Sequence, residues 1–391
     1  MRVAIFTDND FQKVNGVTTT LSAVLRYAPP GLSLRVYTAD SVGADRPEYL
    51  SLRSLPVPIP FYGEMKMYVP RVNEYIRRVR EDRIDLIHLT TPGPMGLVAM
   101  RVARTLNLPM VGTFHTDLAA YTAILSGQQW LGNLMREYMR WPYGRCDRVL
   151  VPSAATRDLL VGAKGHRERI QIWSRGVDTE MFAPARRSEA IRRRWNVSDT
   201  CPAILYVGRI SREKGLDMLP ALQRRLKELG VRHRFILAGQ GPMQQELSEK
   251  LDDAVFTGVL GREDVAVTFA SADVFLFPSR TDTAGNVVLE AQASGLPVLV
   301  SDAGGPQENM VHGDTGRVVN GTDADRWATA LTELLHDRDL RRRLGNGART
   351  YGLSRRWEDA LEPLYRTYGD VLRARAPSVR PTMVVAGGRA S

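Results

Sequence analysis

The feature that most constrains this fold is a regular alternation of short apolar runs, rich in β-branched residues, with longer segments of helical periodicity. The short runs have the length of single strands and are bounded by turn-forming residues. Strands that are separated by helices pair in parallel, because the chain must cross back over the sheet before it can extend it. The sequence therefore predicts an α/β protein whose parallel sheets are covered by helices on both faces.

The alternation falls into two series of strands. Between them, residues 179–199 show no strand pattern and contain several arginines, so we expect a linker with a short basic helix. Helices are expected between the strands, for example at 17–27, 72–80 and 96–107. The predicted strands are 2–8, 33–38, 85–91, 109–115, 148–152 and 169–173 in the first series, and 202–207, 233–238, 254–258, 273–278, 297–301 and 316–319 in the second.

Two doubly wound, Rossmann-like domains that face a cleft are the expected result. We place the first domain at 1–178 and the second at 200–355. Helical patterns continue to about residue 373, and we expect a C-terminal helix at 356–373 that packs back on the first domain. The tail at 374–391 mixes Pro, Gly, Arg and Ser and is expected to be disordered.

Charge and compartment narrow the possible partners. The chain of 391 residues carries a net charge of +10, which points to nucleic acid, an acidic membrane surface or phosphorylated substrates. No run of 18 uncharged apolar residues occurs and the N-terminus becomes acidic at Asp8, so we expect neither a membrane-spanning helix nor a signal peptide. Cys146 and Cys201 lie far apart without metal-type spacing, which indicates reduced thiols and a cytoplasmic location.

A loop with two carboxylates follows the strand at 273–278 and opens onto a helical run at 286–294. Asp282 lies before this helix and Glu290 lies about one turn inside it. The first N–H groups of a helix are unpaired and attract phosphates, while Gly285 leaves room for a close approach to the backbone. Because carboxylates accept hydrogen bonds from hydroxyls, the loop predicts a ligand with phosphates and hydroxyls, such as a nucleotide sugar.

A pair of cations follows the strand at 202–207. Arg209 and Lys214 lie on a strand-to-helix loop, at the carboxyl edge where open α/β sheets bind ligands. Each would add charge-assisted hydrogen bonds of about 1.5–3 kcal/mol to a pyrophosphate. Two solvated surface cations are the alternative in an arginine-rich chain, but together with Asp282 and Glu290 the pair favours a phosphate site.

These motifs together resemble those of the retaining glycosyltransferases of family 4, which have the GT-B fold. The resemblance runs from residue 1 to about 370 in the family's order. It is strongest toward bacterial GDP-mannose-dependent α-mannosyltransferases and toward sulfoquinovosyl- and glucosyl-diacylglycerol synthases. Its further elements are Asn15-Gly16-Val17, Thr113-Phe114-His115-Thr116-Asp117, Arg175-Gly176-Val177-Asp178 and Gly304-Gly305-Pro306-Gln307-Glu308.

The resemblance implies roles for the residues around the helix at 286–294. Glu290 matches the carboxylate that accepts hydrogen bonds from the ribose hydroxyls. Asp282 stands where the family carries Glu and holds a hydroxyl of the donor sugar, so its reach is one methylene shorter. The backbone amides of Asn286 and Val287, directly after Gly285, are implied to cap the pyrophosphate.

The resemblance assigns further donor contacts to other loops. Arg209 and Lys214 match the phosphate-binding pair, and the backbone at Val259 and Leu260 matches the segment that reads the edge of the base. The implied reaction proceeds with retention, by departure of the diphosphate and attack of the acceptor on the same face. Protein groups stabilise the leaving group, so we expect no metal and no other cofactor, and the leaving phosphate itself takes the acceptor proton.

The first domain, on the acceptor side, contributes two implied site residues. Gly16 matches a glycine that approaches the phosphates, and His115 matches a histidine that lines the donor sugar. A histidine at the end of an apolar strand is often a structural residue bonded to the backbone, but the family context favours a donor-site role. Asp117 is open between a helix cap and an acceptor contact, and Glu308 between a site loop and a cap.

Two short motifs suggest other chemistry. Asp8-Asn9-Asp10 looks like the Asp-x-Asp metal motif of the other large glycosyltransferase fold, but short acidic patterns are frequent in loops, where they cap helices. Gly239-Gln240-Gly241 after a strand is only a fragment of a dinucleotide fingerprint, and we do not interpret it as a nicotinamide site.

Two segments combine apolar side chains with arginines and suggest contact with anionic lipid. A core-facing helix with a solvated polar side is the alternative for both. The first is 61–83, with an aromatic and methionine-rich start and a net charge of +3 between 65 and 83. The second is 128–141, which contains Trp130, Leu131, Leu134, Met135, Tyr138, Met139 and Trp141 beside Arg136 and Arg140.

We therefore expect a hexosyltransferase that uses a nucleotide-sugar donor, with mannose from GDP-mannose as the first choice, and a lipid or glycan acceptor. It would act as a peripheral protein at the inner face of the plasma membrane. A UDP-sugar-dependent glycolipid synthase is the alternative within the family. A nucleotide-sugar epimerase and a nucleic-acid-binding protein are the less favoured alternatives. For the second, no nucleic-acid-binding motif accompanies the charge, so specific nucleic-acid binding is not expected.

Overall fold

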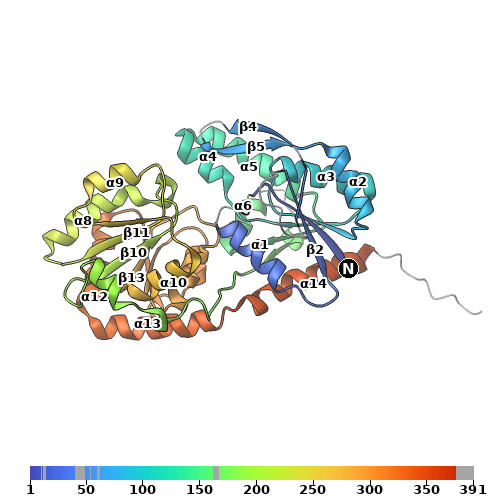
Figure 1. Cartoon of the computed structure of the whole chain (residues 1–391). Helices are drawn as coiled ribbons and strands as arrows, with labels where there is room; N and C mark the ends of the chain where they lie inside the picture. The colour runs from blue at the N-terminus through green and yellow to red at the C-terminus, as the bar shows by residue number, and fades with distance from the viewer. Residues whose placement is uncertain are drawn as a thin grey trace, which may run out of the picture.

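The computed structural model describes residues 1–9, 11, 15–39, 49–52, 54–59, 62–161 and 167–375, without side chains at 55–59 and 62–67. These residues form two parallel sheets, each covered by helices, and one separate hairpin. Figure 1 shows the two sheets in two lobes that lie side by side. The arrangement is the pair of parallel-sheet domains that the alternating pattern predicts.

The first sheet has the strand order β3-β2-β1-β6-β7-β8-β9, and all its pairs are parallel. Its strands are β1 (Arg2–Phe6), β2 (Ser33–Thr38), β3 (Tyr49–Ser51), β6 (Leu86–Leu89), β7 (Met110–Thr113), β8 (Arg148–Val151) and β9 (Ile170–Ile172). Its helices are α1 (Gly16–Arg26), α2 (Val72–Glu81), α3 (Pro94–Leu106), α4 (Leu118–Ser126), α5 (Gln129–Tyr143) and α6 (Ala154–Val161).

The second sheet has the order β12-β11-β10-β13-β14-β15, again parallel throughout. Its strands are β10 (Ala203–Val207), β11 (Arg234–Ala238), β12 (Val255–Gly258), β13 (Val274–Phe277), β14 (Val298–Ser301) and β15 (Gly316–Val319). The surrounding helices are α8 (Leu219–Glu228), α9 (Gln244–Lys250), α10 (Arg262–Ser271), α11 (Asn286–Ala293), α12 (Ala324–His336) and α13 (Arg338–Leu353). Short 3-10 turns lie at Arg167–Arg169, Pro184–Arg186, Arg212–Lys214, Leu216–Met218 and Pro306–Asn309.

The stretch between the two sheets packs against the second domain. It contains the short basic helix α7 (Glu189–Arg194) that the arginine-rich sequence suggests. Phe182, Trp195 and Val197 are buried in the same apolar cluster as the second sheet. Most of the segment 179–199 therefore packs as part of the second domain and is not a free linker.

The last described helix, α14 (Trp357–Arg375), returns to the first domain (Figure 1). Trp357, Leu361 and Tyr368 are buried in one cluster with strands β1, β6, β7 and β8. The chain leaves the first domain at Val177 and comes back at Arg355, and the Val177 amide donates a hydrogen bond to the Arg355 carbonyl (2.7 Å). The two crossings thus lie side by side. The predicted tail lies, from residue 376 on, outside the described residues.

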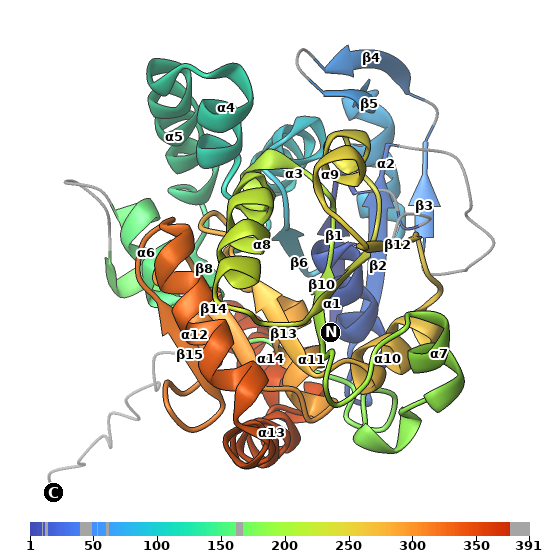
Figure 2. The ribbon, with the colours of Figure 1, turned by 90° about the vertical axis from the view of Figure 1, so that its left-hand side faces the viewer.

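An antiparallel hairpin extends beyond the parallel sheet of the first domain. It consists of β4 (Leu55–Ile59) and β5 (Tyr62–Val69), and Figure 2 shows it next to β3 at the edge of that domain. The sequence did not predict this hairpin. Pro56 and Pro58 lower the strand signal, since proline is found at sheet edges but not in central strands.

Each sheet has a topological switch point. It lies between two neighbouring central strands whose following connections lead to opposite sides of the sheet. In the first sheet it lies between β1 and β6, and in the second between β10 and β13. Ligands of open α/β sheets bind beyond the carboxyl ends of the strands at such points. The loop after β10 carries Arg209 and Lys214, and the loop after β13 carries Asp282, so both predicted phosphate and sugar loops lie at the switch point of the second sheet.

Candidate active site

Lys214 is the centre of a polar contact that joins the two domains. Its Nζ lies 2.9 and 2.8 Å from the carboxylate oxygens of Asp282 and donates to the Tyr121 hydroxyl of α4 at 3.2 Å. Both charged side chains are largely covered, at 13% and 19% exposed. Burial alone would lower the pKa of Lys214, but the Asp282 carboxylate holds that pKa well above its ordinary value. Lys214 therefore stays charged and contacts the first domain at Tyr121.

The loop that carries Lys214 is held against the loop that carries Asp282. Gly215 has φ +73°, and a Cβ there would lie 2.9 Å from the Pro278 carbonyl oxygen, so only glycine fits this approach. The Thr281 hydroxyl donates to the Glu213 carbonyl at 3.0 Å. These backbone contacts place a cation and a carboxylate together although they are 68 residues apart in the sequence.

Two helix N-termini from different domains face each other beside this pair. Helix α11 begins after its N-cap residue Gly285, which has φ +70°. Because glycine has no side chain, no side-chain cap covers the first amides of the helix. The Asn286 side chain donates to the Gly16 carbonyl (3.2 Å) and to the Thr20 hydroxyl (3.3 Å) at the start of α1. The first amides of α1 are capped by the Asn15 side chain, which accepts from the Val17 and Thr18 amides, whereas those of α11 have no side-chain cap. The start of α11 is therefore the helix end that favours an anionic ligand. Val287 follows in the same first turn of α11.

Glu290 lies one turn inside α11 and is half-buried. Within the described part of the chain no hydrogen bond or ion pair to its carboxylate is found. Burial raises its pKa to about 7, and the positive charge of Arg262 opposes this shift. A carboxylate that is partly desolvated and has spare acceptor capacity matches the ribose-binding role that the resemblance implies.

His115 lies at the carboxyl end of β7, as predicted, and contacts the second domain through its backbone. Its carbonyl accepts from the Thr283 hydroxyl at 2.5 Å. Both ring nitrogens lie within hydrogen-bonding distance of protein groups, Nε2 of Thr113 Oγ1 (2.8 Å) and Nδ1 of Arg175 Nη2 (3.4 Å). Burial, and then the Arg175 charge, lower the pKa of His115 well below its ordinary value. A direct contact of this ring with the donor sugar stays a prediction.

The remaining predicted donor residues surround the same sheet edge. Arg209 is half-buried after β10, and its carbonyl accepts from the Tyr206 hydroxyl at 2.8 Å. Val259 and Leu260 follow β12, and the Val259 side chain is 67% exposed. The structure brings Lys214, Asp282, Gly16, Gly285, Asn286 and Val287 together, with Glu290 a turn further along α11. The predicted base-edge segment lies one strand beyond β11, on the same carboxyl side of the sheet.

Three acidic residues with open roles are helix caps in the structure. Asp8 accepts from the Met95 amide at the start of α3 (2.9 Å), which accounts for the first residue of the Asp-Asn-Asp motif; Asp10 lies outside the described residues. Asp117 accepts from the Ala120 amide and caps α4 (3.0 Å). Glu308 accepts from the amides of Ala154 and Ala155 at the start of α6, in the other domain.

Sequence reasoning missed the contacts of Tyr121 and Thr283. Tyr121 lies on a helix of the first domain, and nothing in the local pattern distinguishes it from a packing residue. Thr283 donates to His115 and its carbonyl lies 3.5 Å from the Thr156 hydroxyl of α6. Both contacts depend on how the two domains face each other, which no local sequence signal encodes.

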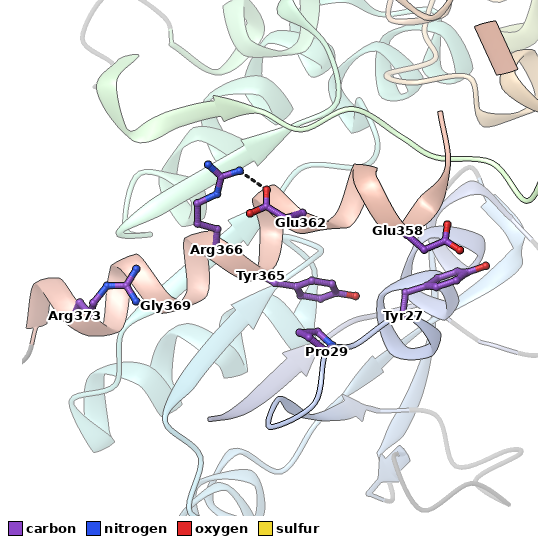
Figure 3. A pocket seen from close by; sticks show the side chains of 8 residues that line it. All are labelled: Tyr27, Pro29, Glu358, Glu362, Tyr365, Arg366, Gly369 and Arg373. Carbon is purple, nitrogen blue, oxygen red and sulfur yellow. Dashed lines mark hydrogen bonds and ion pairs between the residues drawn. The ribbon is translucent and has the colours of Figure 1, made fainter. Parts of the chain in front are cut away.

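A hollow of about 510 Å³ lies elsewhere, between the end of α1 and helix α14 (Figure 3). It is lined by Tyr27, Pro29, Glu358, Glu362, Tyr365, Arg366, Gly369 and Arg373. None of the predicted site residues lines it, and its acidic and basic side chains include the ion pair of Arg366 with Glu362. We place the candidate site at the loops where the uncapped start of α11 and the Lys214 charge lie next to each other.

No group of three or more His, Cys, Asp or Glu side chains in the described part of the chain is arranged to hold a metal ion. Among the helices described here, none is both long enough and apolar enough to cross a membrane.

Comparison with known families gives two consecutive matches. Residues 14–181 match the family described as Glycosyltransferase Family 4, and residues 187–351 match the family described as Glycosyl transferases group 1. The boundary between them coincides with the passage of the chain from the first sheet to the second.

Three relatives of known activity show the range of similarity. A GDP-mannose-dependent alpha-mannosyltransferase of Mycobacterium tuberculosis is 32% identical over 96% of this chain and 98% of its own length. The sulfoquinovosyl transferase SQD2 of Arabidopsis thaliana is 32% identical over 89% of this chain and 69% of its own. An alpha-monoglucosyldiacylglycerol synthase of Streptococcus pneumoniae is 27% identical over 80% and 74%, respectively.

Solved structures agree in fold. A sucrose-phosphate synthase from Thermosynechococcus elongatus superposes with a TM-score of 0.80 over 95% of this chain and 99% of its own, at 22% identity. The Anabaena protein Alr3699/HepE, solved in complex with UDP-glucose, gives a TM-score of 0.76 over 95% of this chain and all of its own, at 17% identity. These likenesses show that the two sheets have the arrangement of the GT-B fold.

Proposed function

We propose that this chain, which belongs to the family 4 glycosyltransferases, transfers a hexose with retention from a nucleotide sugar to a lipid or glycan acceptor at a membrane surface. Family membership confirms the resemblance drawn from the motifs and makes the chain a glycosyltransferase. The donor, the stereochemistry and the membrane surface are the proposed parts, and the following observations support them.

The observation that carries the donor site is the meeting of two helix starts beside a buried cation. The Asn286 side chain at the start of α11 donates to the Gly16 carbonyl at the start of α1, and the Lys214–Asp282 pair lies on the adjoining loops. A diphosphate bound here would be neutralised by helix amides and by Lys214 and Arg209. The hydroxyl-binding carboxylate of Glu290 follows at the distance of one helical turn.

The same groups suggest how the reaction is promoted. As the bond from the sugar to the diphosphate breaks, negative charge grows on the departing phosphate, and fixed cations and amides stabilise it. These protein groups supply the charge that a divalent cation would otherwise supply, and we propose transfer without a metal. The departing phosphate takes the proton of the acceptor hydroxyl on the same face, so the new bond forms with retention.

We propose that the donor breaks the pairing of Lys214 with Asp282 when it binds. Phosphates that reach Lys214 replace Asp282 as the partner of its ammonium group. The released Asp282 carboxylate then accepts a hydrogen bond from a hydroxyl of the donor sugar. The shorter side chain of Asp suits a carboxylate that changes partner within one small cluster.

Donor choice follows from the relatives. We propose GDP-mannose first, because the mycobacterial relative that matches nearly the whole chain is a GDP-mannose-dependent mannosyltransferase. A UDP-sugar-dependent glycolipid synthase is the alternative: SQD2 supports transfer of a sulfoquinovosyl group, and the streptococcal synthase supports transfer of a glucosyl group to diacylglycerol. Of these relatives, the streptococcal synthase is named for a diacylglycerol product, and this supports the proposed lipid acceptor.

The surface of α5 supports a peripheral location at such a surface. Trp130, Leu134, Tyr138 and Trp141 are exposed and recur at intervals of three or four residues, so they lie along one side of the helix. Arg145 stacks on the Trp141 ring at 4.5 Å. Exposed aromatic side chains beside arginines match the boundary of an anionic bilayer, and we propose the inner face of the plasma membrane.

The test is thermal unfolding of the purified protein with GDP, UDP or ADP in the presence of EDTA. A nucleotide at 100 times its dissociation constant stabilises the fold by about 2.7 kcal/mol. We expect one nucleotide to raise Tm in the wild type and to raise it much less in Lys214→Met. A shift with one nucleotide identifies the base for a screen of sugars and acceptors, in which the anomeric configuration of the product tests retention. No shift with any nucleotide in a folded sample would contradict the donor site.

A further inference from the structure

A continuous chain of hydrogen bonds runs from helix α14 to His115. The Tyr368 hydroxyl lies 2.7 Å from Nδ1 of His88, and Nε2 of His88 lies 2.8 Å from Thr113 Oγ1. The same hydroxyl oxygen of Thr113 lies 2.8 Å from Nε2 of His115. Tyr368, His88 and Thr113 are fully buried, so these groups have one another rather than water as partners.

The last contact fixes the direction of the whole chain. Arg175 Nη2 lies 3.4 Å from Nδ1 of His115, and a guanidinium can only donate. Nδ1 of His115 must therefore accept, and the single ring proton of the neutral imidazole lies on Nε2. That proton is donated to the Thr113 hydroxyl, which passes its own hydrogen to Nε2 of His88. His88 then carries its proton on Nδ1 and donates it to the Tyr368 oxygen.

The reverse direction is unfavourable for an electrostatic reason. If Tyr368 donated to His88, the Thr113 hydrogen would point at Nε2 of His115, and His115 would carry its proton on Nδ1. That N–H group would face the positively charged Arg175, donor against donor. Arg175 is 2% exposed, so water does not relieve this repulsion.

We propose that Tyr368, His88 and Thr113 are positioning residues that hold the ring of His115 in its neutral Nε2–H form at the donor site. The proposal rests on the proposed function, in which His115 lies beside the donor sugar. A neutral imidazole adds no positive charge next to a sugar ring that itself becomes positive in the transition state. Burial lowers the pKa of His115 well below its ordinary value and that of His88 to about 3, in agreement with two neutral rings.

The chain also gives α14 a role in the site. Tyr368 is the only contribution of this helix to the hydrogen-bonded chain among the residues that the structure describes. An apolar side chain at position 368 would fill the same space in the apolar cluster around β1. In this direction the Tyr368 oxygen accepts from His88, and among the described residues no acceptor is found for the hydrogen of the Tyr368 hydroxyl. An unmade hydrogen bond of a buried hydroxyl costs stability, so the hydroxyl at this position serves the two histidines rather than packing.

The first test reads the tautomers directly. The protein contains six histidines, few enough to assign their imidazole 15N signals one by one. We expect an Nδ1–H form for His88 and an Nε2–H form for His115 in the wild type. Tyr368→Phe should convert His88 at least partly to the Nε2–H form. The matched control is Tyr365→Phe, which removes a hydroxyl bonded to the Val24 carbonyl on the same helix and should change neither ring. Opposite tautomers in the wild type would overturn the proposal.

The second test is kinetic. We expect Tyr368→Phe and Thr113→Val to lower kcat about tenfold through misplacement of the ring, without a change in the affinity for the nucleoside diphosphate. Thr113→Ser keeps the hydroxyl and should restore the rate, and Tyr365→Phe should retain it. An equal loss in Tyr365→Phe, or no rescue by Thr113→Ser, would overturn the positioning role. If no sugar nucleotide supports transfer, the proposed function fails, whereas the tautomers still decide the direction of the chain.

Discussion

At the scale of single residues, the carboxylate of Glu290 couples donor binding to pH. Its pKa is raised by burial to about 7, so it is about half protonated at neutral pH. Hydrogen bonds from ribose hydroxyls favour the charged form and lower the pKa. We therefore expect nucleotide binding at pH 7 to release roughly half a proton. Calorimetry in buffers of different ionisation enthalpy measures this number, and Glu290→Gln should lower it by the share of Glu290 and weaken binding about 10- to 100-fold.

The same shift predicts a direction for stability without ligand. Since the pKa of Glu290 rises from 4.5 to about 7 on folding, the folded protein binds more protons in this range. Its contribution to stability is full below pH 4.5 and is lost as the pH rises toward 7. Chemical unfolding between pH 5 and 8 should show this loss in the wild type but not in Glu290→Gln. A parallel pH dependence of both proteins would contradict the assignment.

The Lys214–Asp282 pair gives a second prediction at this scale. Asp282→Asn removes the carboxylate that offsets the burial of the Lys214 ammonium, which lowers the stability of the empty protein because a covered charge loses its partner. The phosphates of a nucleoside diphosphate can replace that carboxylate. We expect binding of the diphosphate to be at least as tight as in the wild type, and sugar transfer to fall at least tenfold because a hydroxyl acceptor is lost.

Nucleotide titrations followed by Tm separate these two effects. The nucleotide should restore much of the Tm that Asp282→Asn loses, whereas Lys214→Met should gain little from it. Loss of diphosphate binding in Asp282→Asn would contradict the exchange of partners at Lys214.

Residue roles could be predicted from the sequence only where position on the sheet decides them. Lys214 and Asp282 follow central strands, and parallel strands bring their carboxyl ends to one edge, so their meeting was foreseeable. Asn286 was predicted through its amide, but its side chain bridges to Gly16 across the cleft. That contact depends on the relative placement of two domains, and no short-range pattern reports it.

At the scale of elements, helix and strand positions agree closely with prediction because the apolar runs are long enough to be unambiguous. The predicted strand at 273–278, for example, is β13 at Val274–Phe277. The hairpin of β4 and β5 was missed, since its prolines remove the alternation that marks a strand. The basic, apolar segment at 61–83 is partly outside the described residues. In its helix α2, Arg71 pairs with Glu74 and Arg77 and Arg78 pair with Glu81, so these cations are less available to lipid.

Helix α5 is the element on which the membrane proposal can be tested. Trp130 and Leu134 are 62% and 61% exposed, so their substitution should leave the fold intact. Trp130→Ser with Leu134→Ser removes roughly 300 Å² of apolar surface, or several kcal/mol of membrane affinity at about 25 cal/mol per Å². We expect the double variant to lose binding to vesicles that contain anionic lipid, in a flotation assay.

The matched control for α5 is an exposed leucine of the second domain. Leu229 at the end of α8 is 41% exposed, and Leu229→Ser should bind vesicles like the wild type. Equal binding of the α5 double variant and the wild type would contradict the docking role. Transfer to a water-soluble acceptor should be retained by all three proteins, because α5 does not supply the donor site.

At the scale of the whole molecule, the donor site is complete only when the two domains face each other. The domains are connected by two adjacent crossings, at Val177 and Arg355, which leaves few covalent restraints on their relative orientation. Side-chain contacts between the two domains therefore decide their relative orientation. Glu308 is prominent among them, since its carboxylate accepts from the amides of Ala154 and Ala155 (2.7 and 2.9 Å) at the positive end of α6.

Removal of the Glu308 carboxylate should shift the molecule toward an open arrangement of the two domains. Glu308→Ala loses two charge-assisted hydrogen bonds, which we expect to cost about 1–2 kcal/mol of closure. Because only the closed form joins α1 to α11, the apparent donor affinity falls in proportion to the closed fraction. X-ray scattering should show a larger radius of gyration for Glu308→Ala without ligand, and saturating nucleotide should restore the wild-type value.

Glu362→Ala is the control that separates closure from loss of a surface charge. Glu362 pairs with Arg366 one turn along α14; both side chains are more than half exposed, and the pair does not cross between the domains. Its removal should change neither the radius of gyration nor the donor affinity, since exposed pairs within a helix contribute about 0.3–0.5 kcal/mol. If Glu308→Ala and Glu362→Ala scatter alike, Glu308 does not hold the domains together, and the contacts of Lys214 with Tyr121 and of Thr283 with His115 must suffice to close the cleft.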